Sequence, residues 1–324
     1  MFHLDSSSGF NKLTSVMPMR RKDYLRTFMK NKTLLLMCLP AIVFFIIFCY
    51  IPMPGAYVAF VNYNFTKGIY LSPFVGLQNF KNIFSNGALI NLTINTLSYN
   101  LAFLITTTIG QLAIAVMLSE IGGKWFKKIT QTIMFLPYFI SFVVVGLFMY
   151  SFINYDTGII NEMFQSLGFN KISFYSQSAY WPFLLTFVNF WKNAGYGAVI
   201  YLGVIASLDT NLNEAAAIDG ASTWQRICNV TLPGLRPTVI ILTLYALGGI
   251  LKGNFGLFFN CVMTNSLLYQ ATDVFETYVW RSLMVNFDFS GGSAVNLYQS
   301  VFGLILVLVV NWVVRRLDRD SSLF

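Results

Sequence analysis

Long apolar runs separated by short polar segments dominate the pattern of this 324-residue chain. A helix needs roughly 20 consecutive apolar residues to cross the hydrocarbon core of a bilayer. The sequence therefore predicts an all-α membrane protein with six transmembrane helices. The predicted spans are residues 33–53, 92–118, 130–153, 182–207, 236–256 and 296–314.

The spans divide the chain into a basic N-terminal segment (1–32), a transmembrane domain (33–314) and a tail (315–324). With both termini in the cytoplasm, fifteen of the 21 Lys and Arg residues fall inside and four outside. Because Lys and Arg accumulate in cytoplasmic loops, we expect this orientation. No small-residue cleavage site follows the first apolar run, so we expect the first span to be retained.

The composition of the chain argues against several classes of function. The chain is 56% hydrophobic and only 10% charged, with a net charge of +8. The excess of inside cations accounts for that charge, and membrane lipid is a sufficient anionic partner, so no nucleic-acid partner is predicted. The four cysteines are scattered and the single histidine, His3, lies in the polar N-terminal segment. We therefore expect no metal site and no catalytic residues.

One polar stretch, residues 209–236, lies on the cytoplasmic side between the fourth and fifth spans. Its Glu214-Ala-Ala-Ala run favours a short helix, which Gly220 closes because glycine suits the left-handed position. Ser222 and Gln225 form a capping-box pattern for a second short helix. Leu232-Pro233 is expected to end that helix, since the residue before a proline disfavours the α conformation.

Trp224, Ile227 and Cys228 give the second helix one apolar face. Two interpretations follow from the residues alone. The stretch is either an amphipathic connector lying on lipid or a compact helix–turn–helix whose small alanines let another protein surface approach the backbone.

The spacing of this stretch resembles the EAA signature of binding-protein-dependent ABC importer permeases. Glu-Ala-Ala is followed after three residues by glycine and after nine more by Val-Thr-Leu-Pro, where the family usually has Ile for Val230. Further similarity covers Phe74–Phe80, Trp191–Tyr196 and Phe289–Ala294, as in permeases for polysaccharides and complex oligosaccharides. The chain resembles the larger permease of an alginate-oligosaccharide importer. The residues that match the coupling loop are Glu214, Ala215, Ala216, Asp219, Gly220, Gln225, Leu232 and Pro233.

The resemblance implies a type I importer fold and a set of partners in the bacterial inner membrane. These are a second homologous permease, two ATP-binding subunits and a periplasmic binding protein that delivers an oligosaccharide. The chain contains no G-x-x-x-x-G-K-[ST] phosphate loop, so it binds no cofactor of its own, and ATP and Mg²⁺ belong to the partner ATPase. The loop would transmit ATP-driven closure to the membrane helices.

Polar residues within the spans are candidates for the transport pathway. Asn189, Lys192, Asn193 and Tyr196 recur at i, i+3, i+4 and i+7 and therefore share one helix face. An ionisable residue inside a span invites a functional hypothesis, here that Lys192 binds hydroxyls or a uronate. The alternatives are an internal hydrogen-bond brace and a lysine that extends outward. Lys252, near the outer end of the fifth span, is a further candidate, although extension toward the interface explains it too.

Two other function classes compete with this hypothesis. A stand-alone secondary transporter or channel would use acidic residues in the membrane for ion coupling, but no Asp or Glu falls within the six predicted spans. A membrane enzyme would need paired carboxylates or metal ligands, and the sequence offers no such cluster.

Overall fold

The computed structural model describes residues 31–317 and divides into two compact units, residues 1–55 and 56–324. The described part of the first unit is one apolar run, in which α2 (Lys32–Phe45) continues through the π-helical turn η1 (Ile46–Tyr50). No residue of these two elements is buried within the chain. The predicted first span is therefore helical over most of its length. The predicted basic segment and tail lie outside the described residues, except for residues 31–32 and 315–317.

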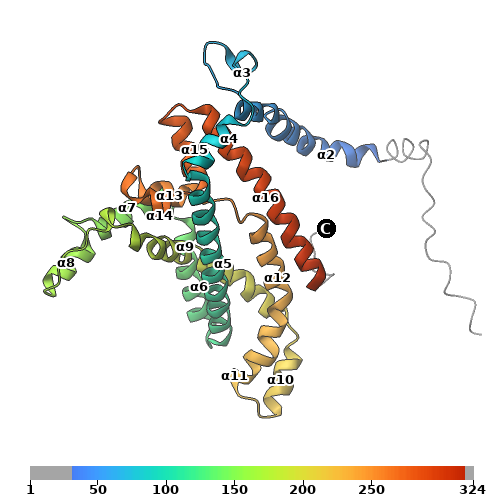
Figure 1. The fold of residues 1–324 in the computed structure, drawn as a ribbon. Coiled ribbons are helices and arrows are strands. Elements are labelled where there is room, and N and C mark those ends of the chain that lie inside the picture. Colours follow the sequence, from blue (N-terminus) through green and yellow to red (C-terminus); the bar gives the residue numbers. More distant parts are fainter. Residues whose placement is uncertain (1–30, 318–324) are drawn as a thin grey trace, which may run out of the picture. The chain divides into compact units, whose positions relative to one another are not determined.

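The described part of the second unit is built from helices and short linkers, and the prediction of an all-α protein is confirmed (Figure 1). One isolated antiparallel bridge joins Val61 to Phe74. The longest helices are α5 (Ala88–Glu120), α9 (Trp181–Ser207), α12 (Leu232–Gly248) and α16 (Phe289–Leu317). The other α-helices are α3 (Gly68–Leu71), α4 (Gln78–Ser85), α6 (Lys124–Phe139), α7 (Phe142–Ile153), α8 (Ile159–Ser166), α10 (Thr210–Ile218), α11 (Thr223–Arg226), α13 (Phe255–Val262), α14 (Tyr269–Thr272) and α15 (Phe275–Met284). Short 3-10 segments are η2 (Met53–Phe60), η3 (Phe174–Ser176), η4 (Ser178–Tyr180) and η6 (Ser266–Leu268).

Helices α5 and α9 pack closely because glycines lie at their contact. A Cβ atom at Gly197 of α9 would come within 2.0 Å of the Gln111 amide on α5. A Cβ at Gly110 of α5 would come within 2.1 Å of the Phe190 ring on α9. Small residues at helix contacts let backbones approach in membrane proteins. Gln111 also donates from Nε2 to the carbonyl of Asn193 at 3.0 Å, so α5 holds α9 in a fixed register.

The predicted third span is not one straight helix. Helices α6 and α7 meet at 96° around Ile140 and Ser141. Ser141 caps α7, since its Oγ accepts a hydrogen bond from the Val144 N–H. Pro137 lies in the last turn of α6, and a sharp bend after a proline is a common cause of a broken helix. The apolar run of 130–153 marks no boundary between the two arms, because both are apolar.

The predicted fifth span, 236–256, has different limits in the structure. Helical backbone begins at Thr223 in α11, passes through the π-helical turn η5 (Ile227–Thr231) and ends with α12 at Gly248. The end falls at the pair Gly248-Gly249, because glycine has little helix propensity. Lys252 therefore lies in a linker beyond the helix rather than within it.

A hydrophobic core forms around the segment that follows α12. Buried residues of α13, including Leu257 and Phe258, pack with Tyr99 and Phe103 of α5 and with Trp181 at the start of α9. This core ties the segment from α13 to α15 to the ends of the long helices. The region between the predicted fifth and sixth spans thus has a defined structure.

Four helical stretches in residues 31–317 are long and apolar enough to cross a bilayer, or five if the bent pair α6–α7 counts as one span. Helix α9 has sufficient length, but Asn189, Lys192 and Asn193 lower its mean hydropathy. The six-span count and the cytoplasmic termini accordingly stay predictions.

Candidate functional site

The predicted coupling loop consists of two short helices, α10 and α11, each fixed at its ends. Asp209 caps α10, with its carboxylate accepting from the Asn211 N–H at 2.9 Å. The capping box of α11 is present: Ser222 Oγ accepts from the Gln225 N–H at 3.3 Å, and Gln225 Oε1 accepts from the Ser222 N–H at 2.7 Å. These reciprocal bonds satisfy N–H groups that a helix start leaves unpaired.

Gly220 turns the chain between the two helices. Its φ is +81°, in the left-handed region that favours glycine. The Ala221 N–H donates to the Ala216 carbonyl at 2.9 Å, and the Gly220 N–H donates to the Ala217 carbonyl at 3.1 Å. This pair of bonds is the Schellman arrangement, which closes a helix at a glycine. Ala216, Ala217 and Gly220 therefore hold the loop in one backbone shape.

The rigid loop carries exposed apolar side chains at its tip. Ile218 is 86% exposed and Trp224 is 71% exposed, while Ile227 is buried. The carboxylates of Glu214 and Asp219 are also on exposed residues. An exposed apolar tip on a preorganised turn has the character of a docking surface.

The prediction that Leu232-Pro233 ends the second helix is wrong. The helix continues through Pro233, which occupies the first turn of α12. The π-helical turn η5 comes immediately before it, and the Leu232 N–H bonds to the Ile227 carbonyl five residues back. A widened turn of this kind accommodates a residue that disrupts regular α-helical hydrogen bonding. Helices α11 and α12, joined by η5, thus form one continuous helix from the loop into the apolar region.

Lys192 of α9 lies at the break between α6 and α7. The residue is only 6% exposed. Its ammonium donates to the carbonyls of Tyr138 at 2.9 Å and Pro137 at 3.3 Å, and also to that of Ile140. A cation is favourable at the C-terminal end of a helix, where carbonyls lack partners. These contacts are those of the internal brace, one of the alternatives that the sequence left open.

The structure separates the four polar candidates of α9. Asn189 is buried, and its carbonyl accepts from Asn193 Nδ2 at 2.8 Å. Tyr196 is 42% exposed and stacks on Tyr138 with 4.4 Å between ring centroids and 12° between planes. The exposed member of the predicted polar face is therefore Tyr196, which pairs with Tyr138 of α6, whereas Asn189 and Lys192 face the interior.

Lys252 lies apart from that group, at a different cavity. A cavity of about 450 Å³ is bounded by the end of α12, the start of α15 and one face of α16. Lys252 and Glu276 both line it, together with Gln299. Burial raises the pKa of Glu276, while the Gln299 amide, backbone N–H groups and the charge of Lys252 oppose that shift.

Sequence reasoning missed the residues that surround Lys192 and Lys252. The partners of Lys192 are backbone carbonyls, which carry no side-chain signal. Glu276 and Gln299 lie 23 residues apart on different helices. The available signal in the sequence was the acidic residue Glu276, which follows Asp273 by three residues.

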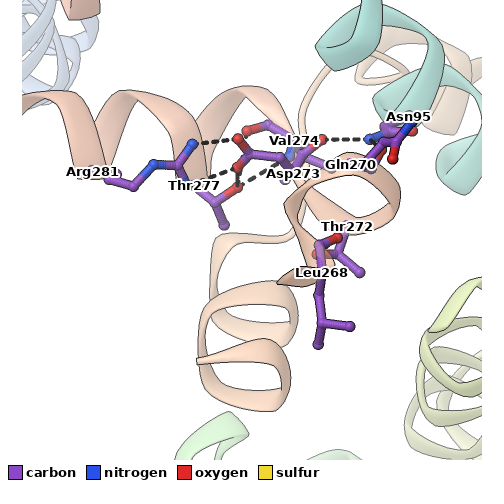
Figure 2. A network of polar contacts seen from close by, with 8 residues as sticks. All are labelled: Asn95, Leu268, Gln270, Thr272, Asp273, Val274, Thr277 and Arg281. Carbon is purple, nitrogen blue, oxygen red and sulfur yellow. Dashed lines mark hydrogen bonds and ion pairs between the residues drawn. The ribbon is translucent and has the colours of Figure 1, made fainter. Parts of the chain in front are cut away.

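A polar network fixes the turn before α15 (Figure 2). Asp273 forms an ion pair with Arg281, and its Oδ1 accepts from Thr277 Oγ1 at 2.7 Å. From α5, Asn95 donates to the carbonyls of Gln270 at 3.0 Å and of Asp273 at 3.1 Å. Burial alone would lower the pKa of Arg281, but its hydrogen bond to Asp273 and that carboxylate's charge raise it overall. The network holds the start of α15, and hence Glu276, against the long helices.

The bundle of long apolar helices, the capped loop and the polar residues within the bundle define a multi-pass membrane transport subunit. The chain belongs to the family described as binding-protein-dependent transport system inner membrane component, which matches residues 111–322. Its fold is that of type I ABC importer permeases, as the sequence predicted.

Two curated relatives extend over nearly the whole chain. Protein LplB of Bacillus subtilis (strain 168) is 32% identical over 299 residues, covering 92% of this chain and 93% of that protein. The polygalacturonan/rhamnogalacturonan transport system permease protein YteP of the same organism is 31% identical over 305 residues, covering 93% and 94%.

Two solved structures are similar throughout. One is the crystal structure of a bacterial ABC transporter involved in the import of the acidic polysaccharide alginate, with a TM-score of 0.81 and 30% identity. The match covers 91% of this chain and 99% of that one. The other is a bacterial alginate ABC transporter in complex with an alginate pentasaccharide-bound periplasmic protein, with a TM-score of 0.80, 30% identity and coverage of 90% and 97%.

Proposed function

We propose that this chain is one of two homologous permease subunits of an ATP-driven importer in the bacterial inner membrane. Its cargo is an oligosaccharide, acidic and alginate-like, which a periplasmic binding protein delivers. Two ATP-binding subunits hydrolyse ATP with Mg²⁺, and the chain itself contributes no catalytic group.

The coupling loop carries this proposal. Ile218 and Trp224 form an exposed apolar tip, and Gly220 together with the Ser222–Gln225 box keeps that tip in one shape. A tip of this kind fits a groove on a partner protein. Because α11 continues through Leu232-Pro233 into α12, movement of a docked partner passes directly to a long helix. A bound partner shifts a conformational equilibrium only if it binds the two conformations with different affinities.

Glu214 and Asp219 would contribute at the rim of the docking surface. Both are exposed, so they can pair with cations of the ATP-binding subunit. Ala215 and Ala216 would permit close approach, since a methyl side chain keeps the helix surface low.

The relatives favour an acidic cargo. The relative YteP is named for polygalacturonan and rhamnogalacturonan, and both similar structures belong to alginate importers. These polymers carry uronate carboxylates. Lys252 is exposed in its cavity and offers N–H donors to sugar hydroxyls along the route. Tyr196 offers an accessible ring face against which a sugar ring packs, and Asn189, Lys192 and Asn193 hold that part of α9 in place.

Reconstitution tests the proposal. The chain would be assembled in proteoliposomes with its partner permease, ATP-binding subunits and binding protein, and uptake of a labelled uronate oligosaccharide would be followed. The expected result is uptake that requires ATP, the loaded binding protein and this chain. Uptake by the purified chain alone, without ATP, would instead identify a stand-alone transporter or channel and contradict the proposal.

A further inference from the structure

The cavity beside Lys252 combines a polar end with an apolar end. Asn296, Gln299 and Ser300 of α16 line the polar end, and Gly303, Leu304 and Val307 continue along the same helix face. The opposite wall is the backbone from Gly248 to Leu251. The volume of the cavity, about 450 Å³, falls within the range of small-molecule sites.

Hydrogen bonds preorganise the polar end. Gln299 Nε2 donates to the Leu251 carbonyl at 2.7 Å and to Glu276 Oε1 at 2.9 Å. From α5, Asn100 Nδ2 donates to the carbonyls of Ile250 at 2.9 Å and of Lys252 at 3.2 Å. The linker after α12 is therefore held from both sides, and the wall of the cavity is formed before any ligand arrives.

Glu276 gives this wall its distinctive chemistry. Its Oε2 is buried without a hydrogen bond of normal geometry. A Cβ at Gly253 would lie 2.3 Å from that oxygen, so the glycine leaves room for the carboxylate. The ammonium of Lys252 supplies an opposite charge nearby. The cavity thus holds one acid and one base and has no net charge to attract an anion.

We propose that this cavity is a binding subsite for one uncharged, hydroxyl-bearing sugar unit of the transported oligosaccharide. The proposal rests on the proposed function and adds to it that the cargo contains a neutral unit as well as uronates. Sugar hydroxyls both donate and accept, which matches the carboxylate, amide, hydroxyl and ammonium groups of the polar end. The apolar end at Leu304 and Val307 suits the C–H face of a ring.

A uronate at the same place would bring its carboxylate toward Glu276. Like charges in a partly buried site repel, and rejection of the wrong ligand by such repulsion is a common source of specificity. The subsite therefore selects a neutral unit through Glu276, while Lys252 balances the carboxylate.

The experiment compares two trisaccharides in the assembled importer, one all-uronate and one containing a neutral rhamnose. Gly303→Leu fills the cavity, and Gly303→Ala is its matched control, because a Cβ there lies 3.7 Å from Leu251 Cδ1, an ordinary contact. We expect Gly303→Leu to lower uptake of the rhamnose-containing trisaccharide on the order of tenfold and Gly303→Ala to leave it unchanged, a tenfold change being about 1.4 kcal/mol. Equal uptake by both variants, at equal amounts of inserted protein, would overturn the subsite.

A second variant tests the chemistry. Glu276→Gln removes the charge and keeps an acceptor for Gln299. We expect the ratio of all-uronate to rhamnose-containing uptake to rise on the order of tenfold, the effect of one charged hydrogen-bonding group. An unchanged ratio contradicts the selective role of Glu276.

Thiol labelling separates this inference from the proposed function. Ser300→Cys, in a chain whose four natural cysteines are replaced, would react with a thiol reagent more slowly when the rhamnose-containing trisaccharide is present. Protection without transport would retain the subsite and overturn the proposed function. Transport without protection would overturn the subsite alone.

Discussion

The ammonium of Lys192 in α9 lies 2.9 Å from the carbonyl oxygen of Tyr138 at the end of α6. It also donates to the carbonyls of Pro137 and Ile140, on either side of Tyr138. An ammonium has three N–H donors, so all of them are used at this helix end. One side chain of α9 thus fixes the point where α6 turns into α7.

Replacement of Lys192 by methionine tests this brace. The variant keeps an unbranched, slightly shorter side chain but leaves carbonyls at the bend without a donor, which costs about 1–3 kcal/mol for an unsatisfied buried group. We expect a lower unfolding temperature in detergent. The control is Lys171→Met, because Lys171 is only partly buried and its ammonium donates to a single carbonyl, that of Asp156, at 3.0 Å. If Lys192→Met keeps full stability and loses only transport, Lys192 acts on the cargo instead.

Two glycines of α9 make a matched pair for packing. A Cβ at Gly195 would lie 1.9 Å from the Met134 carbonyl of α6, whereas a Cβ at Gly203 meets nothing within 4 Å. Gly195→Ala should separate α6 from α9 and destabilise the protein by about 1–3 kcal/mol. Gly203→Ala should be neutral or stabilising by roughly 0.5–1 kcal/mol, since alanine favours the helix. Similar unfolding temperatures for the two variants would show that α6 does not pack at Gly195.

Gly220 allows a test of the loop backbone without loss of any side-chain contact. Alanine at φ +81° costs about 1–2 kcal/mol, whereas asparagine tolerates this region better. We expect Gly220→Ala to reduce ATPase stimulation by the loaded binding protein and Gly220→Asn to retain more of it. The reverse order of the two variants would mean that the left-handed turn does not set coupling.

Glu276 predicts a pH dependence of stability. Its pKa in the folded protein is raised above the ordinary value of 4.5, chiefly by burial. The folded state therefore binds the proton more tightly than the unfolded state, so the contribution of Glu276 to the free energy of unfolding falls as pH rises above 4.5. Glu276→Gln does not titrate, so the variant does not lose stability in this way. The stability of the variant relative to the natural chain should increase from pH 4.5 upward, as measured by thermal unfolding across pH. A pH-independent difference contradicts the raised pKa.

The sequence predicted the helical class and the local form of the loop. Gly220 and the Ser222–Gln225 box depend only on near neighbours in the chain, so their geometry could be predicted from residue types. Pro233 shows the limit of such reasoning, because the π-helical turn before it decides whether the helix continues. A proline signals strain but does not say how the preceding backbone relieves it.

Long-range partners escaped the sequence for a different reason. Lys192 binds backbone carbonyls more than 50 residues away, and any residue type supplies those. The cavity of Lys252, Glu276 and Gln299 forms only when the end of α12, the start of α15 and one face of α16 meet. The predicted polar face from Asn189 to Tyr196 follows helical periodicity, but periodicity does not say which side of α9 is covered.

On the proposed function, the loop tip transmits ATP hydrolysis by a partner to the membrane helices. ATPase stimulation in the reconstituted importer that carries Ile218→Asp tests this transmission. Ile218 is 86% exposed, so the change should not disturb the fold of the chain. Leu167→Asp, at an exposed position beyond α8, is the control. We expect Ile218→Asp to abolish stimulation and to weaken retention of the ATP-binding subunits, while Leu167→Asp behaves as the natural chain. Full stimulation with Ile218→Asp would show that the loop tip does not couple ATP hydrolysis to the membrane helices.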